Sequence, residues 1–213
     1  PDRSAVFDWA SVRLHARFQG EAVAVYARLG QNYLDLDIDG KRVAVLGPKT
    51  SAPDLAWAGL GLPEQLSGAI PVYVYKGLSP GAHTLVLAKR TSPNFGPVTV
   101  LGLRFESAEA LPAPPPAFKR RLEFIGDSLT NGYGTEGPDL KCQTLAPYEN
   151  AERAWARRCA EALKAEAQIL AYSGYGLVRN YGAAESSSKD PVPFYYPRRV
   201  LADPAPPPAG CGI

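Results

Sequence analysis

Residues 121–134 read Arg-Leu-Glu-Phe-Ile-Gly-Asp-Ser-Leu-Thr-Asn-Gly-Tyr-Gly and pass from an apolar run into a glycine-rich turn. The apolar residues at the start of this stretch are typical of a short buried strand. A strand that ends at Gly126 would place Ser128 at the carboxyl edge of a sheet, where open α/β sheets bind ligands. A helix is expected next, with free backbone N–H groups directed towards an anion near Ser128. The pattern therefore favours a nucleophilic Ser128 over an ordinary Gly-Asp-Ser turn.

A helix and a second strand are expected downstream of this turn. Within residues 149–164, apolar or small side chains recur at helical spacing and predict one buried face. The members of this face are Trp155, Cys159, Ala160 and Leu163. Residues 168–172 then form a short apolar strand. A strand, a helix and a strand in this order predict a parallel pair with a right-handed crossover.

The second strand ends at Ser173-Gly-Tyr-Gly176, a turn expected at the same sheet edge as Ser128. A backbone N–H of Gly174 or Gly176 that faces Ser128 would complete an oxyanion hole together with the N–H of Ser128. The alternative is that these glycines only permit a tight bend. Tyr133, Tyr175 and Tyr181 lie near the two turns, where they could stack on sugar rings or serve in packing.

Residues 1–108 show a different periodicity, because apolar and polar residues alternate in several short runs. Asp39-Gly40 is a strong two-residue hairpin signal within this half. About eight strands without a helical window predict an antiparallel β-sandwich, of the jelly-roll type. The clearest runs are residues 12–18, 23–29, 33–39, 42–46, 70–75, 83–88 and 98–105.

Residues 109–118 are expected to link two domains, a sandwich over 1–108 and an α/β domain over 119–213. Four prolines between 111 and 117 favour a stiff, extended linker. Trp9, Trp57, Tyr73 and Tyr75 are candidate sugar platforms in the sandwich, although their apolar neighbours favour core positions.

Composition narrows the class of function. The net charge is +2 and no dense Lys/Arg cluster occurs, so nucleic acid is not an expected partner. No apolar run approaches the ~20 residues that span a bilayer, so no membrane span is expected. Cys142, Cys159 and Cys211 are too few for a disulfide scaffold, and free thiols are favoured over a Cys142–Cys159 bridge. No metal site is expected. A start at Pro1 indicates a processed, trimmed or partial product.

These motifs resemble the GDSL, or SGNH, hydrolases, and within them the two-domain acetyl esterases of carbohydrate esterase family 2. The most specific similarity covers residues 120–137, and a second covers 171–182. Weaker similarity extends over residues 12–20, 32–40, 81–91 and 193–198. The resemblance implies an amino-terminal β-sandwich followed by the first part of a three-layer α/β/α domain.

The resemblance also implies site residues and a substrate. Ser128 would be the acyl nucleophile, Asp127 would brace the turn, Asn131 would support it, and Gly174 or Gly176 would donate to the oxyanion. No cofactor is implied. The substrate would be O-acetylated plant cell-wall polysaccharide of the xylan or mannan type, and the location would be secreted or periplasmic. Nothing in the sequence indicates an oligomeric state.

Two family blocks have no counterpart here, namely a Gly-x-Asn-Asp turn and a late general-base histidine. The chain contains only His15 and His83, both upstream of Ser128 and more typical of structural positions. The resemblance ends close to Asp203. We therefore expect a carboxyl-truncated esterase that is inactive by itself, because a serine hydroxyl needs an adjacent base. The alternatives are a carbohydrate-binding module with a non-catalytic hydrolase remnant, and a GDSL lipase or thioesterase.

Overall fold

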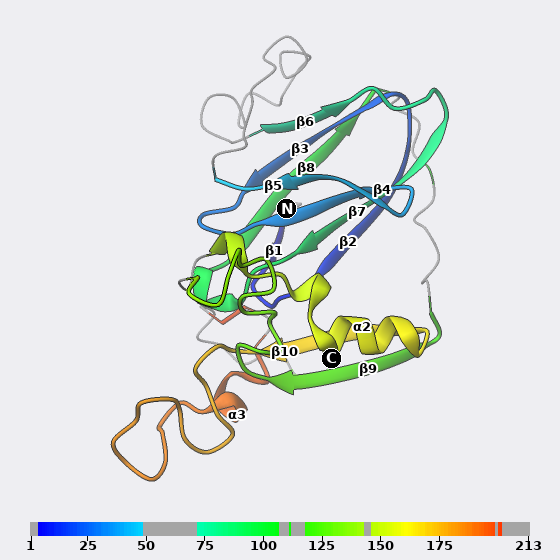
Figure 1. Ribbon diagram of the computed structural model, residues 1–213. Coiled ribbons are helices and arrows are strands. Elements are labelled where there is room, and N and C mark those ends of the chain that lie inside the picture. The colour runs from blue at the N-terminus through cyan, green and yellow to red at the C-terminus, as the bar shows by residue number, and fades with distance from the viewer. Residues whose placement is uncertain are drawn as a thin grey trace. The chain divides into compact units, whose positions relative to one another are not determined.

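The computed structural model describes residues 4–48, 72–106, 111, 118–142, 146–198 and 200–201 (Figure 1). The chain divides into two compact units. The first unit consists of residues 1–6, 13–88 and 98–115, and the second of residues 7–12, 89–97 and 116–213. The Pro-rich run 112–117, Trp57 and Cys211 lie outside the described residues, and the predicted boundaries at 108 and 119 stay a prediction.

The first unit is built from strands in two four-stranded sheets. One sheet has the order β1-β8-β3-β6 and the other the order β2-β7-β4-β5. The pairs β2–β7, β3–β6, β3–β8 and β4–β5 are antiparallel, as the alternating pattern predicted. The bounds are β1 Ala5–Phe7, β2 Arg13–Gln19, β3 Ala22–Arg28, β4 Leu34–Ile38, β5 Lys41–Leu46, β6 Val72–Lys76, β7 Ala82–Lys89 and β8 Val98–Phe105.

Local turn chemistry and apolar side chains hold these sheets together. Asp39 and Gly40 join β4 to β5 with φ angles of 51° and 77°, so the predicted hairpin is confirmed. Two positive φ angles in succession are what a tight hairpin requires, which explains the Asp-Gly pair. Phe18 of β2 is fully buried and stacks on Phe105 of β8, with ring centroids 4.7 Å apart. The two sheets therefore pack against each other through large apolar side chains.

The second unit contains the predicted parallel pair. β9 (Arg120–Gly126) and β10 (Ala165–Ala171) form a two-stranded parallel sheet, and α2 (Trp155–Ala162) lies between them in sequence. Ala156 of α2 packs on Ile169 and Ala171 of β10, with Phe124 of β9 beside them. Four shorter helical segments are η2 (Pro93–Phe95), η3 (Ala146–Tyr148), η4 (Ala151–Arg153) and α3 (Val192–Tyr195).

The predicted helix over 149–164 is shorter than expected, and its buried face is different. α2 buries Ala156, Arg157 and Ala160, whereas Trp155 is 55% and Leu163 47% exposed. Trp155 and Leu163 are therefore not buried as predicted, whereas Ala160 of the predicted face is buried, and the Trp155 ring still meets Phe124 of β9 edge-on with ring centroids 5.5 Å apart. The helix approaches the sheet through Ala156, and the buried Arg157 forms ion pairs with Glu152 and Glu161.

Residues 89–97 belong to the second unit because a buried polar network fixes them there. The Nζ of Lys89 donates to the carbonyls of Thr91 at 2.7 Å and Ser92 at 3.1 Å. The carboxylate of Glu149 accepts the N–H of Ser92 at 2.7 Å. Burial lowers the pKa of Lys89 to about 7, although Asp8 and Glu149 oppose the shift. Buried polar groups of this kind are satisfied by one another, which fixes the path of the segment.

Candidate active site

The turn after β9 presents Ser128 as the sequence suggested. A side chain at Gly126 would meet Thr130, since a Cβ there would lie 2.1 Å from the Thr130 Oγ1, so only glycine fits. The carbonyl of Asp127 accepts the N–H groups of Thr130 and Asn131, both at 3.1 Å. The Asp127 Oδ1 accepts the N–H of Leu129 at 3.0 Å. These bonds hold a tight turn around Ser128.

The helix expected after Ser128 does not form. Residues 127–136 make a series of turns, and the N–H of Tyr133 reaches back to the carbonyl of Ser128 at 2.9 Å. Gly132 and Gly134 adopt φ angles of 77° and 73°, which interrupt a right-handed helix. A Cβ at Gly132 would also lie 2.3 Å from the carbonyl oxygen of Asn150. Gly132 therefore permits close packing of the loop, whereas Gly134 is required only by its positive φ.

The structure brings the two predicted turns to one sheet edge. Gly126 and Ala171 are partners in the parallel register, and the N–H of Tyr172 donates to the Gly126 carbonyl at 3.1 Å. Asn131 is fully buried, and its Nδ2 donates to the Ala171 carbonyl at 3.0 Å and to the Ser173 Oγ at 3.4 Å. Asn131 thus ties the Ser128 turn to the end of β10.

The backbone contacts separate the two candidate oxyanion glycines. The N–H of Gly176 donates to the Asn180 Oδ1 at 3.2 Å and is therefore engaged. Among the described residues, no acceptor takes the N–H of Gly174 or the N–H of Ser128. Gly174 has a φ of 88° and open space where a Cβ would lie. Gly174 is therefore the better-placed donor of the two.

Neither histidine has the character of a base for Ser128. The His83 Nδ1 bonds the Asp39 Oδ2 at 2.6 Å and its Nε2 bonds the Ser79 carbonyl at 2.8 Å, all within the first unit. Both ring nitrogens of His83 are thus engaged, as expected for a structural residue. His15 is an exposed residue of β2. Within the described part of the chain, no side chain bonds the Ser128 hydroxyl.

The aromatic candidates divide into packed and exposed groups. Tyr175 stacks on Tyr172 with ring centroids 3.8 Å apart, so it serves packing. Trp9 and Tyr73 are buried, in agreement with the expectation of core positions. Tyr181, in contrast, is 94% exposed, and its N–H donates to the Gly174 carbonyl at 2.8 Å. Tyr181 is therefore an open aromatic ring on the loop that carries the candidate donor.

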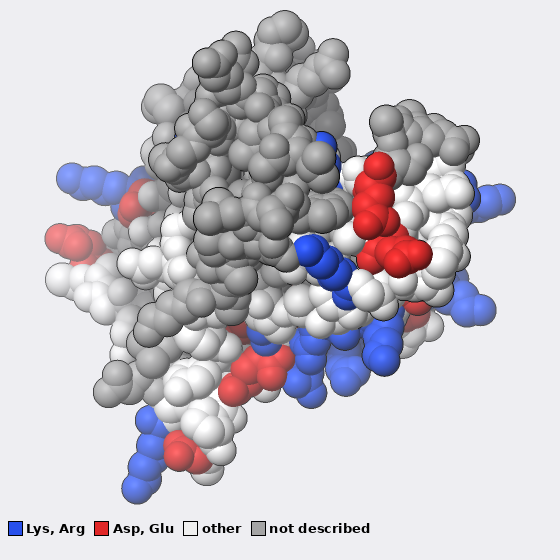
Figure 2. Space-filling model, turned by 90° about the horizontal axis from the view of Figure 1, so that it is seen from above, with Lys and Arg blue, Asp and Glu red and all other residues white. Residues whose placement is uncertain are grey.

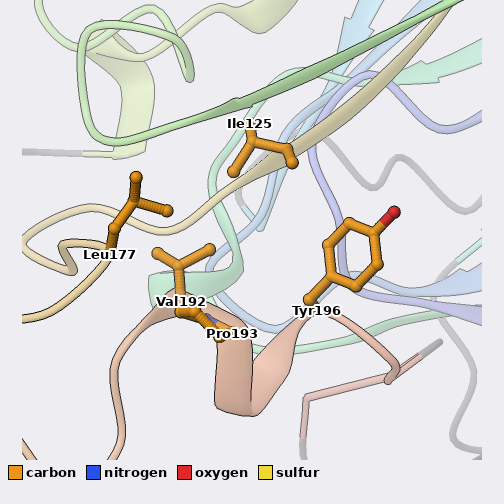
Figure 3. Close-up of a pocket in the computed structure, with 5 residues that line it drawn as sticks. All are labelled: Ile125, Leu177, Val192, Pro193 and Tyr196. Atoms are coloured by element: carbon orange, nitrogen blue, oxygen red, sulfur yellow. The ribbon is translucent and has the colours of Figure 1, made fainter.

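An apolar cavity of about 250 Å³ opens in the second unit (Figure 3). Its lining residues are Ile125, Leu177, Val192, Pro193 and Tyr196. Ile125 and Phe124 are neighbours in β9 and point to opposite faces of the strand. The cavity therefore lies on the face of β9 opposite the one that packs on α2. Apart from the phenol of Tyr196, its lining residues offer no acid, base or nucleophile.

Surface charge, metal-ligand groups and cysteines indicate no further chemistry in the described part of the chain. Figure 2 shows several Lys and Arg side chains along the lower side of this view, beside a smaller group of Asp and Glu side chains. Among the described residues, no group of three His, Cys, Asp or Glu side chains could hold a metal ion. Cys142 and Cys159 are free thiols, as expected. None of the helices described is long and apolar enough to cross a membrane.

The chain is similar to known carbohydrate esterases. Cellulase/esterase CelE of Acetivibrio thermocellus is 33% identical over 177 residues, which are 83% of this chain and 20% of that protein. Acetylxylan esterase / glucomannan deacetylase of Cellvibrio japonicus is 31% identical over 180 residues, 84% of this chain and 44% of that protein. The chain thus spans less than half the length of these curated relatives.

Solved structures agree with these relatives. A family two carbohydrate esterase from Clostridium thermocellum, in complex with cellohexaose, has a TM-score of 0.74 at 30% identity, covering 92% of this chain and 54% of that one. A carbohydrate esterase family 2 enzyme of Corynascus thermopiles has a TM-score of 0.74 at 28% identity, covering 93% and 54%. The family model for the amino-terminal part of carbohydrate esterase 2 matches residues 1–115, more than half of the chain. The chain therefore belongs to carbohydrate esterase family 2.

Proposed function

We propose that this chain carries the nucleophilic half of a serine esterase that removes O-acetyl groups from plant cell-wall polysaccharide of the xylan or mannan type. The observation that supports this most directly is the sheet edge of β9 and β10. There the Ser128 hydroxyl lies in a fixed turn, and the N–H groups of Ser128 and Gly174 have no acceptor among the described residues. Two such donors are what a developing oxyanion needs.

The proposed reaction passes through an acetyl-enzyme. The Ser128 Oγ attacks the acetyl carbonyl and forms a C–O bond, while the carbonyl oxygen takes up negative charge at the N–H groups of Ser128 and Gly174. The ester C–O bond then breaks and the sugar hydroxyl leaves with a proton. Water later attacks the acetyl-serine and releases acetate. Both steps need a group that accepts and returns a proton.

That proton-transferring group is the part that this chain does not offer. The sequence has no histidine after Ser128, and His83 is bonded within the first unit. We therefore propose that the 213-residue chain alone is nearly inactive. In the complete site, a base and a further oxyanion donor would come from residues outside this sequence. The proposal further includes a jelly-roll topology for the first unit, an SGNH-type α/β/α layering for the second, and a secreted or periplasmic location.

The test joins this chain to the carboxyl-terminal part of the Clostridium thermocellum family member, so that a base is present. Ser128→Ala should lower the hydrolysis of 4-nitrophenyl acetate by about 10³-fold or more, because the nucleophile is removed. Ser186→Ala, at an exposed serine of the same unit, is the matched control and should keep the rate. Equal rates for Ser128→Ala and the parent would place the nucleophile elsewhere. Preference for an octanoate ester would instead favour a lipase.

A second candidate function is non-catalytic glycan binding. The family member from Clostridium thermocellum was solved with cellohexaose, and Tyr181 here is an open ring beside Gly174. Exposed aromatic rings stack on sugars. Calorimetric titration with cellohexaose should show binding that Tyr181→Ala weakens. Tyr133→Ala, which removes a ring that is only 39% exposed, is the comparison variant. Binding with no acetate release after a base is supplied would favour this function over the first.

A further inference from the structure

We propose that Asn94 is a positioning residue that orients the N–H of Gly174 towards the oxyanion. Asn94 lies in η2, in the segment between β7 and β8, and is 79 positions away in sequence from the residue it holds. The inference rests on the proposed esterase function and adds to it a residue outside the strand turns that carry the nucleophile and the donor.

Two hydrogen bonds join the Asn94 side chain to the backbone of Ser173. The Asn94 Nδ2 donates to the Ser173 carbonyl at 3.1 Å, and the Asn94 Oδ1 accepts the Ser173 N–H at 3.1 Å. The amide of Asn94 thus pairs with one residue in the way that a neighbouring strand would. Two bonds to one residue restrain its rotation as well as its position.

The restraint passes directly to Gly174 through one peptide group. The carbonyl of Ser173 and the N–H of Gly174 belong to the same planar unit and point in opposite directions across a trans peptide bond. A donor that fixes the Ser173 carbonyl therefore fixes the direction of the Gly174 N–H. Gly174 itself has a φ of 88° and no contact where a side chain would lie. Its carbonyl accepts the N–H of Tyr181 at 2.8 Å, but that bond holds the following peptide group and not the one that carries the Gly174 N–H.

Asn94 can act as a restraint because its own segment is anchored. The N–H of Ser92 donates to the Glu149 carboxylate at 2.7 Å, and the N–H of Ala151 donates to the Arg90 carbonyl at 2.8 Å. The Arg90 Nη2 also bonds the Glu136 Oε1 at 2.7 Å. Pro93, which precedes Asn94, is buried and fixes its own φ. The segment that carries the Asn94 amide is therefore itself anchored by hydrogen bonds.

The contribution to catalysis would arise from preorganisation. A donor aimed at the oxyanion before the reaction needs no rearrangement when charge develops. Deleting an oxyanion donor costs ~10²–10³-fold in rate, so loss of a residue that only aims it should cost less. We expect a loss of roughly tenfold when Asn94 is truncated.

The test uses the 213-residue chain with Ser128→Cys, because a thiolate attacks without a separate base. Cys142→Ser, Cys159→Ala and Cys211→Ser remove the other thiols in every variant. Attack on 4-nitrophenyl acetate forms a thioester, releases 4-nitrophenolate and passes through an oxyanion. Attack on iodoacetamide forms a thioether, releases iodide and develops no oxyanion. The ratio of the two rate constants therefore reports oxyanion stabilisation separately from exposure and thiol pKa.

Asn94→Ala should lower the rate of acylation roughly tenfold and change alkylation by less than about twofold. Asn94→Asp keeps an acceptor for the Ser173 N–H but lacks the donor to the Ser173 carbonyl, so it should resemble Asn94→Ala. Ser188→Ala is the matched control, because it removes another side-chain hydrogen bond from the same loop, that of the Asn180 N–H to the Ser188 Oγ at 2.9 Å, and should leave the ratio within about twofold.

The outcomes separate the inference from the proposed function. The first comparison is between the Ser128→Cys chain and N-acetylcysteine at equal thiolate fraction. If the ratio of acylation to alkylation is no higher in the chain, no oxyanion hole exists, and both the proposed function and the role of Asn94 are overturned. A higher ratio that Asn94→Ala leaves unchanged would overturn only the role of Asn94. Equal losses in both rates for Asn94→Ala, or an equal effect of Ser188→Ala on the ratio, would show a general loosening of the loop and would overturn the role of Asn94 as well.

Discussion

The two units differ in how fully they bury their apolar side chains. In the first, eight strands in two sheets enclose side chains such as Phe18, Leu85 and Leu87, which have no exposed surface. In the second, the sheet has only β9 and β10, and both outer strand edges lack a strand partner among the described residues. Among the residues that the structure describes, the exposed large hydrophobic side chains other than Val6 lie in the second unit.

This difference follows from sheet size. Two strands with one short helix cannot cover both faces and both edges, whereas two packed sheets enclose their inner faces. The chemistry is divided in the same way, because the first unit holds both histidines and the second holds Ser128. The two packed sheets and the proposed nucleophile Ser128 are therefore found in different parts of the chain.

The largest expected effect concerns catalysis by the chain alone. The 213-residue chain and its Ser128→Ala variant should hydrolyse 4-nitrophenyl acetate at rates equal within about twofold, and about 10³-fold or more below a chain supplied with a base. Stopped-flow or plate assays of 4-nitrophenolate release measure this. A saturable rate that Ser128→Ala abolishes would mean that His15 or His83 serves Ser128 across the division between the units.

The next effect concerns the core. Phe18→Ala should lower the free energy of unfolding by about 3–5 kcal/mol, because it leaves a cavity against Phe105. Leu163→Ala, at a 47% exposed position, should change it by no more than about 0.5 kcal/mol. Urea unfolding followed by circular dichroism gives both values. Similar losses for the two variants would contradict the contrast between a closed and an open unit.

Proteolysis should show the same contrast. Under limited digestion, cleavage in residues 109–118 or after Gly182 should precede cleavage within residues 1–108 by at least about tenfold in rate, because local opening needs less energy where fewer apolar groups are buried. Mass spectrometry of the fragments identifies the sites. Loss of the amino-terminal half before the carboxyl-terminal half would refute this order.

The smallest effect is a pH dependence confined to the first unit. The hydrogen bond to Asp39, with a second to Ser79, raises the pKa of His83. A raised folded pKa means that the contribution to stability is complete below about 6.5, the unfolded pKa, and is lost as pH rises through the folded value. Asp39 is half exposed, so the change should stay below about 1 kcal/mol. The difference in stability between the parent chain and His83→Gln should therefore shrink from acidic to mildly alkaline urea titrations, because Lys89, with its pKa lowered to about 7, contributes equally to both proteins. A difference that does not change with pH would assign the effect to another group.

The local sequence determined the features that depend on a few neighbouring residues. The Asp39-Gly40 hairpin formed because both residues accept positive φ angles. β9 ended at Gly126 because only glycine fits against Thr130. The strands expected at 121–126 and 168–172 formed as β9 and β10, and they paired in parallel because a helix connects them. Each of these results follows from sterics or periodicity that a short window of sequence contains.

Tertiary structure decided the features that depend on distant partners. Gly174 and Gly176 look alike in sequence, and the structure distinguishes them by the bond from the Gly176 N–H to Asn180 and by the positive φ of Gly174. Trp155 has the spacing of a buried residue, yet it is exposed because α2 meets the sheet through Ala156 and Ala160. Asn94 gave no signal at all, because its partner is 79 positions away. Hydrogen-bond pairing across such separations depends on how the chain packs, and no local pattern encodes it.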